Sequence, residues 1–174
     1  NELSHLQADA PSMGWLFVKR RMTAELGENW LNNFKDFDKQ ASAAASLGQV
    51  HFAESTDGKE LACKLQYPDM GSAVQADLKQ LKLIFSLYEK YDTAISTEAI
   101  HEELSDRLKE ELDYSHEIRN LKLYRHMLSD QSEITLPDPV EHLSTNRLLT
   151  MTRVYGLKIM DFIANNSEIK MRNQ

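Results

Sequence analysis

The chain has 174 residues, of which 41% are hydrophobic and 27% charged, as in an ordinary globular domain with its own core. Its net charge of −7 argues against a nucleic-acid binder, because phosphate recognition relies on a basic face. The single cysteine, Cys63, allows no internal disulfide and fits a reducing compartment. No apolar run approaches the roughly 18 residues of a membrane span, and the first residues lack a signal-peptide layout. We therefore expect a cytoplasmic protein.

The first third of the chain predicts a helix and then strands. Residues 15–22 carry an apolar period typical of a helix, and Gly27 can end that helix. A short apolar group follows at residues 30–34. Between residues 37 and 66 the apolar period shortens to two, and residues 56–58 read Thr-Asp-Gly, a hairpin turn. We expect two or three antiparallel strands in this part.

Helical periodicity returns in the second half of the chain. Residues 74–91 place apolar side chains on one stripe, and residues 97–128 predict one long helix with an acidic surface. Residues 136–154 predict two short strands around a turn at residues 144–146, and residues 155–169 predict another helix. The order predicts an α+β fold: a small antiparallel sheet of about five strands with long helices packed on it.

Several of these features occur in the order found in a protein-kinase N-lobe: a turn of small residues, a hairpin, a strand lysine, a helix with glutamates and two more strands. Small residues let the backbone approach phosphate oxygens, the lysine supplies charge to the α and β phosphates, and a helix carboxylate positions the lysine. Lys64 is the candidate lysine. Each feature also has a plain structural reading, because strand lysines usually point to solvent, alanine runs form helices and acidic helices are usually solvated.

Other catalytic chemistries find little support in the residues. The six histidines have no metal-ligand spacing, since His101-Glu102 lacks the second histidine of H-E-x-x-H. No G-x-S-x-G nucleophile motif occurs. We expect no metal site within this chain.

Four ordered segments carry a resemblance that is far more specific than any one of them. They read ASAAASLGQVH, DGKELACKLQYPDM, KEELDYSHEIRNL and RLLTMTRVYGLKIMDF, and together they resemble the UbiB/ADCK family of atypical protein-kinase-like proteins. The similarity runs from about Asp36 to Phe162. It implies a helical N-terminal extension over residues 1–35, a kinase-like N-lobe over 36–153, and a hinge with the start of the C-lobe over 154–174.

The resemblance also implies roles for single residues. An alanine-rich loop would cover the nucleotide phosphates in place of a glycine-rich loop, and its methyl groups would alter nucleotide selectivity. Gly48 and Gln49 would complete the turn into the next strand, and the segment 151–153 would form the hinge beside the adenine. The nucleotide-binding residues implied are Ala43, Ala44, Ala45, Ser46, Lys64, Glu117, Met151 and Arg153.

Glu111 and Asp113 match the family's regulatory E-x-D motif. On one continuous helix, Asp113 and Glu117 would lie about 40° apart and face the same cleft, offering Lys64 two carboxylates, whereas Glu111 would lie about 120° from Glu117. Glu111 should be exposed and idle, because no K-x-G-Q motif, its expected partner, occurs in this chain.

At the level of function, the resemblance implies binding of ATP or ADP, with Mg²⁺ held mainly by a C-lobe. It implies an ATP-dependent parent that supports isoprenoid-quinone (ubiquinone) biosynthesis, with quinone-biosynthesis proteins or membrane lipid as partners, peripheral to the inner membrane. Nothing after Phe162 resembles a catalytic loop or a metal-binding aspartate, so we expect a lobe that is incomplete for catalysis. The alternative is a non-catalytic, pseudokinase-like module that binds a partner through its acidic helix.

Overall fold

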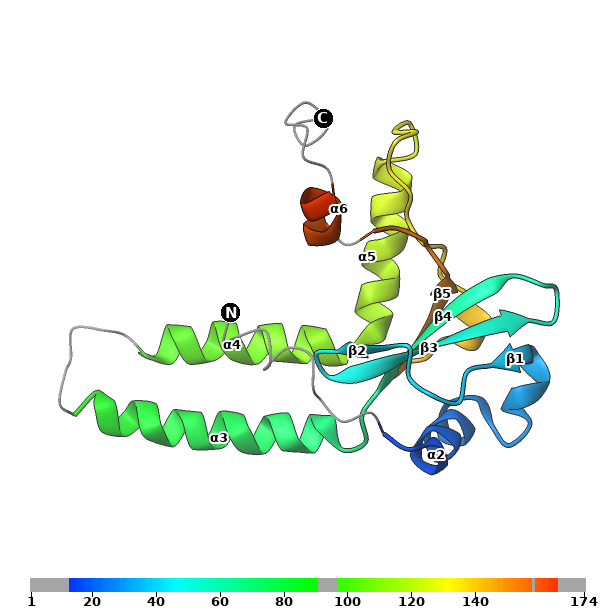
Figure 1. Cartoon of the computed structure of the whole chain (residues 1–174). Coiled ribbons are helices and arrows are strands. Elements are labelled where there is room, and N and C mark those ends of the chain that lie inside the picture. Colours follow the sequence, from blue (N-terminus) through cyan, green and yellow to red (C-terminus); the bar gives the residue numbers. More distant parts are fainter. Residues whose placement is uncertain (1–12, 91–96, 158, 166–174) are drawn as a thin grey trace.

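The structure, a computed structural model, describes residues 13–90, 97–157 and 159–165. A five-stranded antiparallel sheet lies at its centre, and helices pack on both sides, which confirms the α+β prediction (Figure 1). The elements in chain order are α2 (Trp15–Leu26), the 3-10 helix η1 (Trp30–Asn33), β1 (Phe34–Phe37), β2 (Ala43–Ala45), β3 (Gly48–Ser55), β4 (Glu60–Gln66), α3 (Met70–Tyr88), α4 (Thr97–Leu112), α5 (Tyr114–Met127), the 3-10 helix η2 (Glu141–Leu143), β5 (Leu148–Thr152) and α6 (Ile159–Asn165).

Strand β3 is the hub of the sheet. The order is β1-β3-β4-β5, and β2 pairs with the part of β3 that β1 leaves free. The β3–β4 hairpin turns at the predicted position, where Gly58 takes a φ of 82° that a glycine adopts without strain. The cross-strand register aligns Ala43, Val50, Lys64 and Leu149 in one row across four strands.

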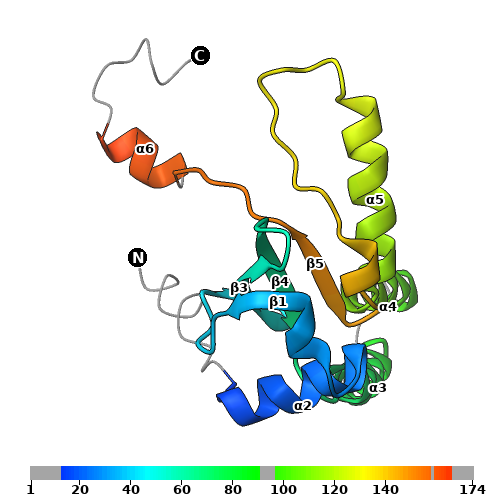
Figure 2. The ribbon, with the colours of Figure 1, turned by 90° about the vertical axis from the view of Figure 1, so that its right-hand side faces the viewer.

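The sheet has two faces, which we name the core face and the Lys64 face. Side chains alternate along a strand, so the register assigns positions 49, 51, 61, 63, 65, 148 and 150 to the core face. Positions 48, 50, 52, 62, 64, 66, 149 and 151 share the Lys64 face. Figure 2 shows α2 and α5 on opposite sides of the sheet.

The main core lies under α2 and η1. Val18, Met22 and Trp30 are at most 1% exposed and belong to one cluster with Cys63 and Leu148 from the core face. Gly27, with a φ of 86°, ends α2 and donates its N–H to Thr23, as predicted. The cluster crosses the expected boundary between residues 35 and 36, so α2 and η1 pack with the strands as one unit.

The prediction of one long helix over residues 97–128 is wrong. Two helices, α4 and α5, meet at Asp113, whose φ of −105° and ψ of 90° interrupt the helical backbone. The Asp113 carboxylate accepts the N–H of Ser115 at 3.0 Å and so caps α5. In Figure 1, α3 and α4 run side by side as an arm beyond the sheet, and α5 departs in another direction.

Two further expectations and one alternative reading need correction. The segment 136–147 contributes η2 and two isolated bridges, Pro139 to Met151 and Thr145 to Leu148, instead of a strand, because Pro137 and Pro139 supply no N–H for a ladder. The alanine run is a strand, so its helical reading does not apply. The last predicted helix begins later, at Ile159, and residues 166–169 of that prediction lie outside the described residues.

Candidate functional site

The Lys64–Glu117 ion pair is the centre of the candidate site. The Lys64 Nζ lies 2.7 Å from Oε2 and 3.0 Å from Oε1 of Glu117, which confirms the predicted pair. The Lys64 side chain is 20% exposed and that of Glu117 is 43% exposed. Water therefore reaches the pair, and both groups remain accessible to a ligand.

Hydrogen bonds at the junction of α4 and α5 fix Glu117 over the sheet. Gln66, two residues beyond Lys64 on the same face, donates its Nε2–H to the Leu112 carbonyl at 3.1 Å. The Tyr114 N–H donates to the Asn146 carbonyl at 3.1 Å, and the Ser115 hydroxyl bonds to the Asn146 side chain. These contacts join the first turn of α5, which carries Glu117, to β4 and to the turn before β5.

Tyr114 lies beneath the pair and is 1% exposed. The Lys64 Nζ lies 4.7 Å from the centroid of the Tyr114 ring, a cation–π distance. Burial, reinforced by the charges of Glu117 and Glu111, raises the pKa of the Tyr114 phenol, so the ring stays neutral at physiological pH. The ammonium is therefore held between a carboxylate and an aromatic face.

A cavity of about 340 Å³ opens beside the pair. Its walls come from β4, the last turns of α4 and the first turns of α5, and its lining residues are Lys64, Arg107, Glu110, Glu111, His116, Glu117 and Asn120. Arg107 is bound to Glu103 and Glu110. Lys64 is thus the cation at the cavity floor, and its remaining N–H can serve a ligand.

The alanine strand lies on the same face as Lys64 but outside this cavity. Ala43 pairs with Val50 and Ala45 with Gly48, so both methyl groups point to the Lys64 face, whereas Ala44 pairs with Gln49 on the core side. Ala43 lies two strand spacings from Lys64, roughly 10 Å. A tight turn at Ser46 leads into β3. The phosphate-binding role of these residues stays a prediction.

Gly48, expected to complete the turn, is instead the first residue of β3. A Cβ built there would lie 2.4 Å from the Leu65 carbonyl oxygen and 3.0 Å from its carbon, closer than real Cβ atoms come. Only glycine lets β3 approach β4 at the position where the alanine hairpin begins.

The structure separates Asp113 from Glu117. Asp113 caps α5 and lies 3.7 Å from Arg119, so the expectation that it shares a helix face with Glu117 and offers Lys64 a second carboxylate is wrong. Glu111 sits in the last turn of α4 on the cavity rim and is exposed, and no hydrogen bond or ion pair to its side chain is found among the described residues. Its regulatory role stays a prediction.

The predicted hinge is partly occupied by sheet hydrogen bonds. Met151 points to the Lys64 face, but the N–H of Thr152 donates to Asp138 and the N–H of Arg153 donates to Glu60, each at 2.9 Å. The Arg153 guanidinium covers the Phe52 ring at 3.7 Å from its centroid. The Arg153 N–H is therefore unavailable to an adenine edge. Within the described part of the chain, Val154 is the first residue after β5 whose backbone N–H makes no backbone hydrogen bond.

Sequence reasoning missed Gln66, Tyr114 and Asn146. Gln66 had a usable signal, because it is polar, follows Lys64 by two residues in a strand and so shares its face. The roles of Tyr114 and Asn146 depend on how α5 approaches the turn before β5, which no local pattern encodes.

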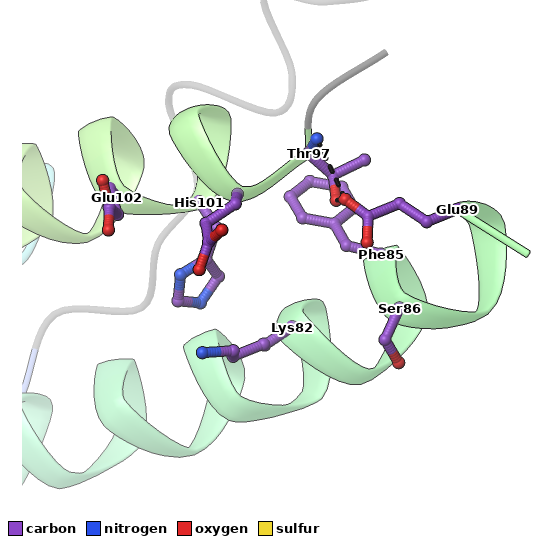
Figure 3. A pocket seen from close by; sticks show the side chains of 8 residues that line it. Lys82, Phe85, Ser86, Glu89, Thr97, His101 and Glu102 are labelled. Atoms are coloured by element: carbon purple, nitrogen blue, oxygen red, sulfur yellow. Dashed lines mark hydrogen bonds between the residues drawn. The ribbon is translucent and has the colours of Figure 1, made fainter. Parts of the chain in front are cut away.

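A smaller hollow of about 150 Å³ lies between α3 and α4 and contains none of the predicted site residues (Figure 3). The Glu89 carboxylate at the end of α3 accepts the Thr97 N–H at 3.2 Å and also the Thr97 hydroxyl. His101 points from α4 toward α3, and its Nε2 lies 3.0 Å from the Leu78 carbonyl oxygen. These contacts hold the two helices of the arm together.

Neither a metal-binding cluster nor a membrane-spanning helix is found in the part of the chain that the structure describes. Residues 13–90, 97–157 and 159–165 contain no cluster of three or more His, Cys, Asp or Glu side chains arranged for a metal ion. Among the helices in those ranges, none is both long and apolar enough to cross a membrane.

Comparison with known proteins places this geometry in a family. Residues 5–173 match the model of the ABC1 atypical kinase-like domain. The chain is 32% identical over 168 residues to "Atypical kinase COQ8, mitochondrial" of Saccharomyces cerevisiae, covering 97% of this chain and 34% of that protein. It is 33% identical over 180 residues to "Protein ACTIVITY OF BC1 COMPLEX KINASE 7, chloroplastic" of Arabidopsis thaliana, covering 99% and 26%.

Among solved structures, the Rv3197–erythromycin complex from Mycobacterium tuberculosis matches with a TM-score of 0.81 and 28% identity, covering 98% of this chain and 42% of that one. The chain thus spans about a third or less of the two curated relatives and under half of the solved protein. The family match confirms the resemblance drawn from the four sequence segments. The chain belongs to the ABC1 atypical kinase-like domain family.

Proposed function

We propose that this chain is the nucleotide-binding N-lobe of an atypical kinase-like protein and that it binds ATP or ADP on the Lys64 face. The observation that carries the proposal is the Lys64–Glu117 pair, which aims an accessible ammonium into a 340 Å³ cavity. Ala43 and Ala45 lie on the same face, where small side chains leave room for phosphate groups.

The residues present fit a nucleotide better than they fit its metal ion. Lys64 supplies a positive charge and one N–H donor that Glu117 does not occupy, and a cavity of this size lies within the range of small-molecule sites. Among the described residues, no group of three or more His, Cys, Asp or Glu side chains is arranged to hold a metal ion. The family resemblance supports Mg²⁺ being held mainly by residues outside this lobe, as in phosphoryl-transfer proteins.

The physical role of Glu117 is to position the lysine. A lysine side chain has four rotatable bonds, and the carboxylate and the Tyr114 ring together restrict its ammonium to one place. The pair is too exposed to add much stability, since ion pairs in contact with water are worth about 0–1 kcal/mol. Its value is that the charge is in place before the phosphates arrive.

Titration of the full-length protein with a fluorescent ADP analogue tests the proposal. Lys64→Ala and Glu117→Ala should each weaken affinity by at least about tenfold, since hydrogen bonds to charged groups are worth roughly 1.5–3 kcal/mol. The double variant should be little worse than either single one, because the two residues act as a unit.

Lys35→Ala is the matched control. Lys35 is also a strand lysine, paired at 2.6 Å with Glu54, but it lies on β1 away from the cavity. Affinity should survive this substitution. Equal affinity of wild-type and Lys64→Ala protein would contradict the proposed site.

A pseudokinase-like interaction module remains the second candidate function. The observation that favours it is the surface of α4, where exposed Ile100 and Leu104 lie among carboxylates and can receive an apolar, basic partner helix. Absence of any Mg-ATP or Mg-ADP binding by the full-length protein would favour this candidate over the first.

At the level of the parent protein, we propose support of isoprenoid-quinone biosynthesis, with biosynthetic proteins or membrane lipid as partners at an inner membrane. The support is the sequence resemblance together with the names of the relatives, which include a mitochondrial atypical kinase and a chloroplastic protein named for the activity of the BC1 complex. Deleting the gene and measuring cellular quinone tests it, with a Lys64→Ala gene as the matched complementation control.

A further inference from the structure

Two buried polar residues on the core face have no part in the site described above. Gln49 and His51 are both 0% exposed and lie two positions apart on β3. The Gln49 Oε1 accepts the Met13 N–H at 2.7 Å, the Gln49 Nε2 lies 2.8 Å from the His51 Nε2, and the His51 Nδ1 lies 2.8 Å from the Asp38 carbonyl oxygen. The three contacts form a continuous relay from Met13 to Asp38.

The partners fix every proton in this relay. A carbonyl oxygen only accepts, so the His51 Nδ1 must carry the hydrogen that it donates to Asp38. The His51 Nε2 is then a lone pair and accepts the Gln49 Nε2–H, which leaves the Gln49 Oε1 to accept the Met13 N–H. A neutral His51 with its hydrogen on Nδ1 therefore satisfies all three bonds.

The relay lies directly under the alanine strand. Asp38 begins the loop between β1 and β2, and its N–H donates to the Phe52 carbonyl at 2.9 Å, while Ser42 at the end of that loop donates to the Val50 carbonyl at 2.8 Å. Gln49 itself is the cross-strand partner of Ala44. One set of bonds thus fixes the entry to β2, the register of the hairpin and the start of α2.

An imidazolium at position 51 cannot keep these bonds. Its Nε2–H would meet the Gln49 amide N–H donors, and turning the amide over would place those donors against the Met13 N–H instead. Burial lowers the pKa of His51, in line with this conflict. Among the charged side chains in the described part of the chain, Asp38 acts against this lowering, because its negative charge raises the pKa of His51. Cys63, the pairing partner of His51 on β4, stays neutral because burial raises its pKa to about 12.

We propose that Gln49 and His51 are positioning residues for the nucleotide site: their relay holds the alanine hairpin in register, and protonation of His51 releases it. The inference rests on the proposed nucleotide function. It adds regulation to it, since acidification would loosen the hairpin and lower nucleotide affinity without touching Lys64.

The test is ADP-analogue affinity of the full-length protein between pH 7.5 and about pH 5, because burial lowers the pKa of His51 and moves its protonation below the ordinary value near 6.5. The wild-type protein should lose about fivefold or more in affinity at the acidic end of this range, the lower end of typical coupling between sites. His51→Gln should bind more weakly at pH 7.5 and lose this dependence. Gln49→Glu should reverse it, because a carboxylate accepts from both the Met13 N–H and an imidazolium.

Thr150→Val is the matched control. Thr150 is equally buried on the core face and donates to the Leu143 carbonyl at 2.6 Å, but it has no bond to the hairpin. It should keep the wild-type pH profile even if it lowers stability. A wild-type profile in His51→Gln would overturn the proposal, as would a profile in Thr150→Val like that of His51→Gln.

A second readout separates the relay from the nucleotide site. The ¹⁵N shifts of the His51 ring report its tautomer without any nucleotide, and we expect hydrogen on Nδ1 at pH 7.5. If the wild-type protein binds no nucleotide, the proposed function fails, and the ring shifts still decide whether the relay exists. Nucleotide binding together with hydrogen on Nε2 would overturn the relay alone.

Discussion

On the core face of β4, Leu61, Cys63 and Leu65 are at most 1% exposed and belong to one apolar cluster. On the opposite face of the same strand, Lys64 keeps 20% of its side chain in solvent and holds Glu117 at 2.7 Å. Alternate residues of a single strand therefore serve different ends. The core face carries the stability of the lobe, and the Lys64 face carries charge that is kept available.

The strongest way to break the core face is Trp30→Ala. Trp30 is 1% exposed and packs edge-on against Phe34 and Phe37, with centroids 6.1 and 5.1 Å away. Its truncation should cost about 3–5 kcal/mol of unfolding free energy by urea denaturation. The neighbouring Leu31 is 45% exposed, and Leu31→Ala should cost far less. Equal losses of unfolding free energy in the two variants would mean that Trp30 is not a central core residue.

Gly48→Ala tests the close backbone contact between β3 and β4, the strands that carry both faces. The added methyl would meet the Leu65 carbonyl at 2.4 Å, so the strands must separate, at a cost of roughly 1–3 kcal/mol. Gly71 in α3 has no atom within 4 Å of such a methyl, and Gly71→Ala should be neutral or stabilising by up to about 1 kcal/mol. Thermal melts of both variants decide it, and an unchanged melt of Gly48→Ala would be the contrary result.

Lys64→Ala tests whether the Lys64 face contributes to binding and not to stability. Because the pair is partly in water, its loss should change the unfolding free energy by less than about 1 kcal/mol while nucleotide affinity collapses. Urea melts and titrations on the same sample give both numbers. A loss of several kcal/mol would mean that Lys64 is a core residue and not a site residue.

The two faces also divide the alanine strand. Ala45→Gly removes a methyl group from the Lys64 face and should change the ratio of ATP to ADP affinity, whereas Ala44→Gly removes one from the core side and should not. Each should cost only about 0.5–1 kcal/mol of stability, as for glycine in a strand. If both variants shift the ratio of ATP to ADP affinity equally, the face on which the methyl group lies is not the cause.

Glu111→Gln should have the smallest effect. Glu111 is exposed on the cavity rim, so neutralising it should change the unfolding free energy by less than roughly 0.5 kcal/mol, the range of surface substitutions. A large loss in a urea melt would reveal a partner for this carboxylate that the described residues do not supply.

Local patterns were sufficient for the strand that carries the site. The alternation of Leu61, Cys63 and Leu65 placed Lys64 on the other face, and the family motif named Glu117 as its partner; both agree with the structure. The β3–β4 hairpin also turns at Gly58, where the sequence predicts it.

Features set by contacts between distant residues escaped prediction. The helical period continues across Asp113 on both sides, so periodicity alone hides the break, although Asp113 followed by Ser115 is a capping signal. The alanine strand owes its conformation to pairing with β3, which overrides alanine's helical preference. The relay needs Met13 to meet Gln49 across 36 residues, and only the packing of α2 brings them together.

The single cysteine of this chain can report how often the central sheet opens. Cys63 lies at the centre of the sheet, 0% exposed, and burial holds its thiol protonated with a pKa near 12. A thiol reagent reacts only with an exposed thiolate, so it must wait until β4 opens. The labelling rate measured at Cys63 itself therefore reports how often the central sheet comes apart, with and without nucleotide.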